Sequence, residues 1–143
     1  MKVELFTIRD IEQMVELEQE NFTRPYRKED FMKAIDHPMW DYYVAKREDD
    51  VIGMCGIQLI CGEGTITNLC VNESYRKLQV GTVLLQKVME YSTSKGAEAY
   101  TLEVRASNQA AIGLYKKSGF VEEGKRKNFY DNPVEDALIL WRR

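Results

Sequence analysis

The sequence predicts a single α/β domain built on one mixed, mostly antiparallel sheet with helices on both of its faces. The 143 residues have the length of one ordinary domain, and neither a linker nor an internal repeat divides residues 1–143. Strand-like and helix-like segments follow one another in the order β-α-α-β-β-β-α-β-α-β-β. Three consecutive strands followed by strand–helix–strand units are typical of a mixed sheet that helices cover on both sides.

The first half of the chain predicts one strand, two helices and then three consecutive strands. Asp10 is a typical N-cap for the first helix, whose apolar residues recur at helical spacing until Pro25 interrupts the pattern. The second helix is short and ends near Pro38. Polar and glycine-containing turns separate the strands. The expected ranges are strand Val3–Ile8, a helix from Asp10 to about Phe22, helix Glu29–Ile35, and strands Tyr42–Lys46, Val51–Ile60 and Thr65–Val71.

The second half predicts two helices that alternate with strands. Apolar residues at helical spacing follow Val80, and Gly96 is a typical stop signal. The next helix is capped by Ser107 or Asn108 and ended by Gly119. The expected ranges are helix Val80–Lys95, strand Tyr100–Arg105, a helix from Asn108 to Gly119, an extended restart at Phe120–Val121, and a final strand Ala137–Trp141.

Composition and charge exclude several classes of protein. A net charge of −3 argues against nonspecific nucleic-acid binding, which needs a basic face. Cys55, Cys61 and Cys70 form no CxxC pair and His37 is the single histidine, so we expect neither a metal site nor a disulfide scaffold. Free thiols favour the cytoplasm. The sequence has no apolar run of about 18 residues, so we expect no membrane span.

Residues 71–82 combine a strand end, a basic turn and a helix that starts at Gly81. Backbone N–H groups at a helix N-terminus, with Arg76 and Lys77 nearby, suit a pyrophosphate. A solvated basic loop with a packing glycine is the alternative that this local pattern leaves open. A nucleotide-hydrolysing P-loop is excluded because no Gly-Lys-Ser/Thr follows, and GxGxxG is absent.

Two motifs resemble those of a known family. Arg76-Lys77-Leu78-Gln79-Val80-Gly81 matches the frame of the acetyl-CoA loop of the GNAT N-acetyltransferases. The longer segment from Leu102 to Tyr115, which includes Leu-Glu-Val-Arg-Ala-Ser-Asn, resembles the ribosomal-protein alanine N-acetyltransferases (RimI type). The tail from Arg126 to Ala137 is similar to that subfamily as well. The resemblance covers essentially the whole chain and implies a GNAT fold.

The resemblance also implies roles for individual residues. Glu103 would be the general base and Tyr115 the general acid, whereas Tyr26, Tyr130 and Glu135 would bind the acceptor. On residue type alone, Glu103 is equally compatible with an exposed glutamate paired with Arg105 or a lysine. Tyr115 is compatible with core packing, and Asn108 with a helix cap. The implied acetyl-CoA contacts are Leu69, Cys70, Val71, Arg76, Lys77, Leu78, Gln79, Val80, Gly81, Thr82 and Asn108.

Gln79 departs from the family pattern, because it occupies the first glycine position of the loop. In a left-handed conformation a side chain there costs about 1 to 2 kcal/mol. This cost corresponds to a five- to thirtyfold weaker affinity, roughly, for the cofactor. The cost disappears if the position is helical.

The expected reaction is therefore transfer of acetyl from acetyl-CoA to the N-terminal α-amino group of a protein. The resemblance implies that the acceptor is the N-terminal alanine of a small-subunit ribosomal protein. Two alternatives remain open on the sequence: an acetyltransferase of a small amine or a lysine side chain, and a noncatalytic acetyl-CoA-binding module. Retention of both Glu103 and Tyr115 argues against the second alternative.

Overall fold

The computed structural model describes residues 1–76 and 79–143. These residues form a seven-stranded sheet and four α-helices in the predicted order. The strands are β1 (Lys2–Leu5), β2 (Trp40–Arg47), β3 (Asp50–Ile60), β4 (Glu63–Val71), β5 (Ala99–Arg105), β6 (Val121–Tyr130) and β7 (Glu135–Arg142). The helices are α1 (Ile11–Asn21), α2 (Lys28–Ala34), α3 (Val80–Ser94) and α4 (Gln109–Lys117).

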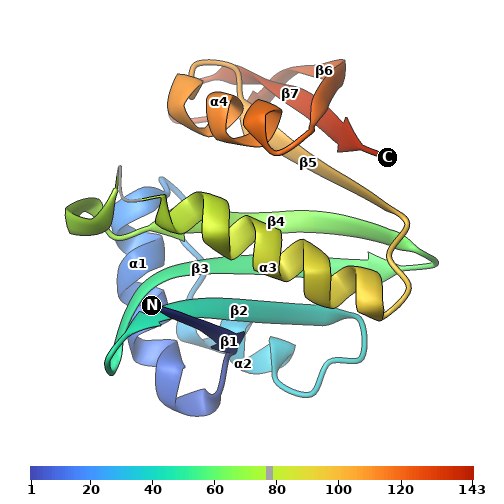
Figure 1. Ribbon diagram of the computed structural model, residues 1–143. Helices are drawn as coiled ribbons and strands as arrows, with labels where there is room; N and C mark the ends of the chain where they lie inside the picture. Colours follow the sequence, from blue (N-terminus) through green and yellow to red (C-terminus); the bar gives the residue numbers. More distant parts are fainter. Residues whose placement is uncertain (77–78) are drawn as a thin grey trace.

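The sheet confirms the predicted fold class. Its strand order is β1-β2-β3-β4-β5-β7-β6, and β4 with β5 is the parallel pair among otherwise antiparallel neighbours in the described residues. Helices α3 and α4 cover one face and α1 and α2 cover the other (Figure 1). The expected arrangement of helices on both faces of one mixed sheet is therefore observed.

Each face of the sheet has its own hydrophobic core. On the α3 side, Leu84, Leu85 and Val88 are fully buried. On the other side, Met14 of α1 and Phe31 of α2 are fully buried against the strands. The buried residues of α1 and α3 recur at three- and four-residue spacing, so burial of one stripe accounts for the helical periodicity of the sequence.

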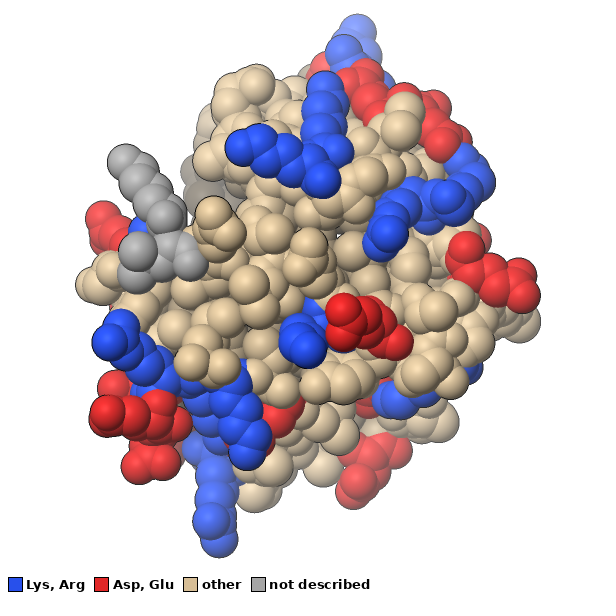
Figure 2. All heavy atoms as spheres, in the orientation of Figure 1, with Lys and Arg blue, Asp and Glu red and all other residues tan. Residues whose placement is uncertain are grey.

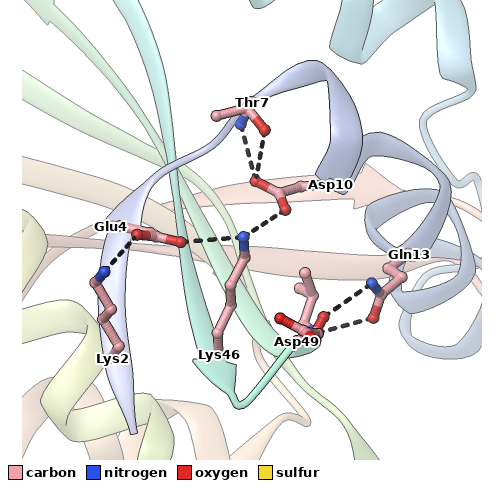
Figure 3. A network of polar contacts seen from close by, with 8 residues as sticks. Lys2, Glu4, Thr7, Asp10, Gln13, Lys46 and Asp49 are labelled. Carbon is pink, nitrogen blue, oxygen red and sulfur yellow. Dashed lines mark hydrogen bonds and ion pairs between the residues drawn. The ribbon is translucent and has the colours of Figure 1, made fainter.

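The first strand is shorter than expected. β1 ends at Leu5, and a 3-10 turn (Ile8–Asp10) leads into α1. The Asp10 carboxylate accepts a hydrogen bond from the backbone N–H of Thr7 at 2.8 Å and forms an ion pair with Lys46 of β2 at 2.7 Å (Figure 3). Asp10 does precede α1, but its side chain ties the chain back to β1 and β2 and does not cap the helix.

Strands β4 and β5 separate after a short paired segment. In the described part of the chain they pair only at Glu63–Ala99, Gly64–Tyr100 and Thr65–Thr101. Beyond these pairs the carboxyl ends of the two strands diverge, and the N-termini of α3 and α4 follow these ends (Figure 1). The divergence opens the middle of the sheet.

A β-bulge in β4 lies where the divergence begins. Thr67 and Asn68 both lie opposite the single Gly56 of β3. Gly56 has no room for a side chain, because a Cβ atom there would lie 2.4 Å from Thr67 Oγ1 and 2.6 Å from the ring of Tyr42. Glycine at position 56 therefore permits the close approach of Thr67 and Tyr42 to β3.

The surface carries charges of both signs. On the face of Figure 2, Lys and Arg side chains alternate with Asp and Glu around the rim, and uncharged residues fill most of the centre. Within the described ranges, no helix is both long enough and apolar enough to cross a membrane.

Candidate active site

A cavity of about 430 Å³ lies between the diverging ends of β4 and β5. Its walls come from both strands, from α4, from the end of α1 with the loop after it, and from the chain around the β6–β7 turn. It brings together five of the residues that the sequence predicts for the site: Leu69, Glu103, Asn108, Tyr115 and Tyr130. Residues that are 82 positions apart in the chain, such as Thr23 and Arg105, meet at its wall.

Glu103 projects from β5 with its side chain 35% exposed. Its neighbours Leu102 and Val104 are buried on the opposite face of the strand, as the alternation predicts. The carboxylate forms an ion pair with Arg126 Nε at 3.0 Å, and within the described ranges no ion pair links it to Arg105 or to a lysine. The Arg126 side chain is 58% exposed, and exposed ion pairs are weak, so an amine in the cavity can compete with Arg126 for the carboxylate.

Tyr115 comes from α4 and is 7% exposed. Its ring packs edge-on against Phe120 with 5.8 Å between the ring centroids. Burial raises the pKa of the Tyr115 phenol well above its usual range, so this group is protonated at neutral pH. The ring belongs to the core and the residue also lines the cavity, so its position is compatible with core packing and with a contact to a ligand.

The end of β4 offers backbone groups to the cavity. Asn72 N–H donates to Ile52 C=O of β3 at 2.7 Å. Because hydrogen-bonded and non-hydrogen-bonded pairs alternate along antiparallel strands, Cys70 faces β3, whereas Leu69 and Val71 turn their backbone groups toward the opening. The Val71 carbonyl accepts a bond from Arg76 Nε at 3.3 Å, in agreement with this direction.

The Cys70 side chain lies on the face of the sheet that α1 and α2 cover. It is 5% exposed and packs in the core that α1 and α2 cover. Burial raises the pKa of the Cys70 thiol well above its ordinary value, and such a thiol is a poor nucleophile.

The N-terminus of α3 follows the end of β4 closely. Gln79 is the N-cap residue and has the left-handed conformation, with φ 61° and ψ 19°. The N–H groups of the first helical turn, at Val80, Gly81 and Thr82, have no acceptor within the helix. Gly81 allows α3 to approach α4, because a Cβ atom there would lie 2.8 Å from Leu114 Cδ1. The predicted contacts Lys77 and Leu78 lie outside the described residues.

Asn108 caps α4 with one atom of its amide. Its Oδ1 accepts a hydrogen bond from the N–H of Ala111 at 3.1 Å. No acceptor among the described residues takes its Nδ2 hydrogens, which can therefore donate to a ligand in the cavity that Asn108 lines. The two readings of Asn108, as helix cap and as a contact to a ligand, are thus compatible.

The three predicted acceptor residues are differently placed. Tyr130 lines the cavity, and its pKa is raised first by burial and then by the negative charge of Glu103 nearby. Tyr26 packs instead between the rings of Phe31 and Trp40, at 6.0 and 6.1 Å between centroids. Glu135 has both carboxylate oxygens engaged by other groups of the protein.

Sequence reasoning missed a buried polar cluster beneath the bulge. Glu18 of α1 is 1% exposed, and its carboxylate accepts hydrogen bonds from Asn68 Nδ2 and from the backbone N–H of Tyr26, the latter at 2.9 Å. Tyr42 donates to Asn68 Oδ1 at 2.9 Å. The cluster joins the loop after α1 to the β4 bulge. Glu18 lies in the apolar stripe of α1, and an acidic residue at such a position is the sequence pattern from which the cluster could have been predicted.

Comparison with known proteins decides the family. A family model described as the acetyltransferase (GNAT) family matches residues 7–120. The chain belongs to the GNAT acetyltransferases. A Bacillus subtilis (strain 168) protein named "Putative ribosomal protein bS18-alanine N-acetyltransferase" is 37% identical over 135 residues, which cover 94% of this chain and 89% of that protein.

Two Escherichia coli comparisons agree with this assignment. The ribosomal protein bS18-alanine N-acetyltransferase of strain K12 is 38% identical over 85 residues, which cover 58% of this chain and 57% of that protein. The crystal structure of the ribosomal-protein-S18-alanine N-acetyltransferase from this organism superposes with a TM-score of 0.90 at 26% identity. That superposition covers 99% of this chain and 92% of the other.

The family fixes the class of reaction as acetyl transfer from acetyl-CoA to an amine. The arrangement of this chain fits that co-substrate. An extended pantetheine arm needs backbone partners between two strands, and the open edge of β4 supplies them at Leu69 and Val71. A pyrophosphate needs N–H donors, and the first turn of α3 lies at the end of the same strand.

Proposed function

We propose that this GNAT enzyme acetylates the N-terminal α-amino group of a protein, and that its acceptor is the N-terminal alanine of a small-subunit ribosomal protein. The observation that carries the proposal is the likeness over almost the whole chain to the E. coli enzyme whose name states this reaction. The cavity supports it, because the loop after α1 and the chain around the β6–β7 turn enclose, together with Glu103, a space of about 430 Å³. A ribosomal acceptor would place the reaction in the cytoplasm.

Glu103 and Tyr115 are proposed as the proton-transfer pair. Acetyl-CoA supplies a thioester carbonyl that an amine can attack. Glu103 accepts the proton that the acceptor amine releases as the C–N bond forms, and Tyr115 donates its phenolic proton to the thiolate as the C–S bond breaks. Their placement suits these roles, because the Glu103 carboxylate is partly exposed to the cavity, whereas burial raises the pKa of the Tyr115 phenol and keeps it protonated.

The remaining predicted residues are proposed to bind and orient. The backbone of β4 at Leu69 and Val71 holds the pantetheine arm and polarises the acetyl carbonyl. Arg76 and the first turn of α3, from Val80 to Thr82, hold the pyrophosphate, and Nδ2 of Asn108 donates to the arm. Tyr130 borders the acceptor beside Glu103.

The acceptor's own chemistry is compatible with a single carboxylate base. An α-amino group has a pKa of about 7.7 to 8.0 and a lysine side chain about 10.4. At pH 7, deprotonation therefore costs about 1 kcal/mol for the first amine and about 4.6 kcal/mol for the second. Removal of the amine proton by Glu103 therefore requires less free energy at a chain terminus than at a lysine side chain.

The test is CoA release in the presence of acetyl-CoA and a short peptide with a free N-terminal alanine. A peptide that is blocked at its terminus and carries a free lysine is the control acceptor. We expect turnover on the free terminus alone, with the added mass on the α-nitrogen. Turnover on the lysine, or on small amines alone, would contradict the proposal.

A matched pair of variants tests the proposed base. Glu103→Gln should lower kcat by about 10² to 10⁴-fold. Glu123→Gln is the control, since Glu123 of β6 is likewise a partly exposed glutamate that forms an ion pair with an arginine, Arg143. Equal rates for the two variants would remove Glu103 from the mechanism.

A further inference from the structure

The guanidinium group of Arg105 lies between the two loops that border the cavity. Arg105 is the last residue of β5, two positions after Glu103. Its Nη2 donates to the carbonyl of Asp131 at 2.9 Å and to Thr23 Oγ1 at 3.4 Å, and its Nη1 donates to the carbonyl of Pro133 at 3.0 Å. One side chain thus contacts the loop after α1 and the β6–β7 turn.

A carboxylate and an aromatic ring complete its surroundings. Arg105 Nη1 forms an ion pair with Glu135 at 3.2 Å, and the other Glu135 oxygen accepts the N–H of Ser107 at 2.8 Å. The guanidinium carbon lies 4.5 Å from the centroid of the Tyr130 ring. Both charged side chains are largely buried, with 24% of Arg105 and 15% of Glu135 exposed. Arg105 therefore neutralises the charge of Glu135 within the protein.

We propose that Arg105 is a positioning residue that joins the loop after α1 to the β6–β7 turn. By joining them it assembles the acceptor slot, the part of the cavity that these two segments border. The proposal rests on the proposed function, because it takes the slot to be the place of the peptide terminus. Glu135 acts through Arg105 and holds it in place. Tyr130, on which Arg105 stacks, is the wall residue that this contact orients beside Glu103.

The chemistry of arginine suits this task and that of lysine does not. A planar fork with five N–H donors reaches several acceptors at once and stacks on a ring, whereas an ammonium group is a point charge. A second link between the same loops, the ion pair of Arg24 with Asp131 at 2.6 Å, has side chains that are 78% and 52% exposed. Exposed pairs contribute little, so Arg105 is the main connection.

Arg105→Met and Arg105→Lys test the proposal, with Arg143→Met as the matched control. Arg143 also pairs with a glutamate, Glu123, and its guanidinium carbon also lies over a ring, 4.3 Å from the centroid of Trp141. These contacts are at the opposite end of β7 from the slot. The measurements are amide hydrogen exchange in residues 22–26 and 130–135, kcat, and KM for the alanine peptide and for acetyl-CoA.

In Arg105→Met we expect exchange in both segments to rise by about tenfold or more. The peptide KM should rise by about tenfold or more, whereas the acetyl-CoA KM should stay within about twofold. Arg105→Lys should lie between wild type and Arg105→Met, and Arg143→Met should match wild type. Arg105→Lys decides the question if Arg105→Met fails to fold.

Faster exchange in only one segment, or in neither, would overturn the bridging role. A lower kcat with an unchanged peptide KM would assign Arg105 to the chemical step and overturn its role in the slot. If the wild type acetylates no peptide, the proposed function fails, and hydrogen exchange alone then decides whether Arg105 joins the two loops.

Discussion

Gln79 is the N-cap residue of α3, and its backbone has a left-handed conformation that residues with a side chain rarely adopt. Its φ of 61° and ψ of 19° bring the Cβ atom close to the following carbonyl, which costs about 1 to 2 kcal/mol. Glycine removes this strain but adds about 0.5 to 1 kcal/mol of chain entropy to the unfolded state. We therefore expect Gln79→Gly to raise the free energy of unfolding by about 0.5 to 1 kcal/mol. For a chain of this length, Tm should rise by about 1 to 4 °C.

The assay is thermal and urea unfolding followed by circular dichroism. Gln79→Ala is the control, because it removes the same side chain but keeps the Cβ atom and hence the strain. We expect Gln79→Ala to unfold within about 0.5 kcal/mol of wild type, as exposed substitutions commonly do. Equal stabilities of the Gly and Ala variants would refute the reasoning.

The same variants show whether the strain lowers the stability of the fold or the affinity for acetyl-CoA. Because the left-handed residue is the N-cap of α3, we expect its cost in the stability of the fold, and an acetyl-CoA affinity within about twofold of wild type in Gln79→Gly. A gain of five- to thirtyfold, roughly, in affinity without a change in Tm would assign the cost to cofactor binding.

Three further predictions concern other parts of the molecule. Tyr115→Phe should slow acetyl transfer by about tenfold or more with Tm preserved, and near wild-type single-turnover rates would remove Tyr115 from the mechanism. Gly56→Ala should cost about 1 to 3 kcal/mol in urea unfolding, because its Cβ atom would overlap Thr67 and Tyr42, and an unchanged midpoint would contradict this. Burial raises the pKa of Glu18 above 4.5, so ionising it destabilises the fold as pH rises through its folded pKa. The stability of Glu18→Gln relative to wild type should therefore increase between pH 4.5 and neutrality, and parallel urea midpoints would contradict this.

The elements with a clear periodicity could be predicted from the sequence. Helix α3 buries Leu84 and Val88 on one stripe, and this stripe is visible as helical spacing. The sequence predicts β6 only at Phe120–Val121, because the edge strand is mostly exposed and shows no apolar alternation. Its partner β7 has buried residues, and the sequence predicts its central part, Ala137–Trp141.

The site could be predicted where one local motif carries it. Glu103 and Tyr115 belong to one continuous segment, and the structure places both at one cavity. The role of Arg105 depends on residues that are 26 and 82 positions away, so no local pattern reveals it. The same holds for Glu18 and Asn68, whose contact spans 50 positions.

The divergence of β4 and β5 has a mechanical consequence. Among the described residues, the sheet joins strands β1 to β4 with β5, β7 and β6 through three residue pairs, and beyond these pairs the packing around α3 and α4 holds the two parts together. A ligand that bonds to the backbone of β4 on one side and to Asn108 on the other would add a further connection between these two parts. Binding then stabilises the folded enzyme, and the rise in Tm at a given ligand concentration reports how tightly the ligand binds.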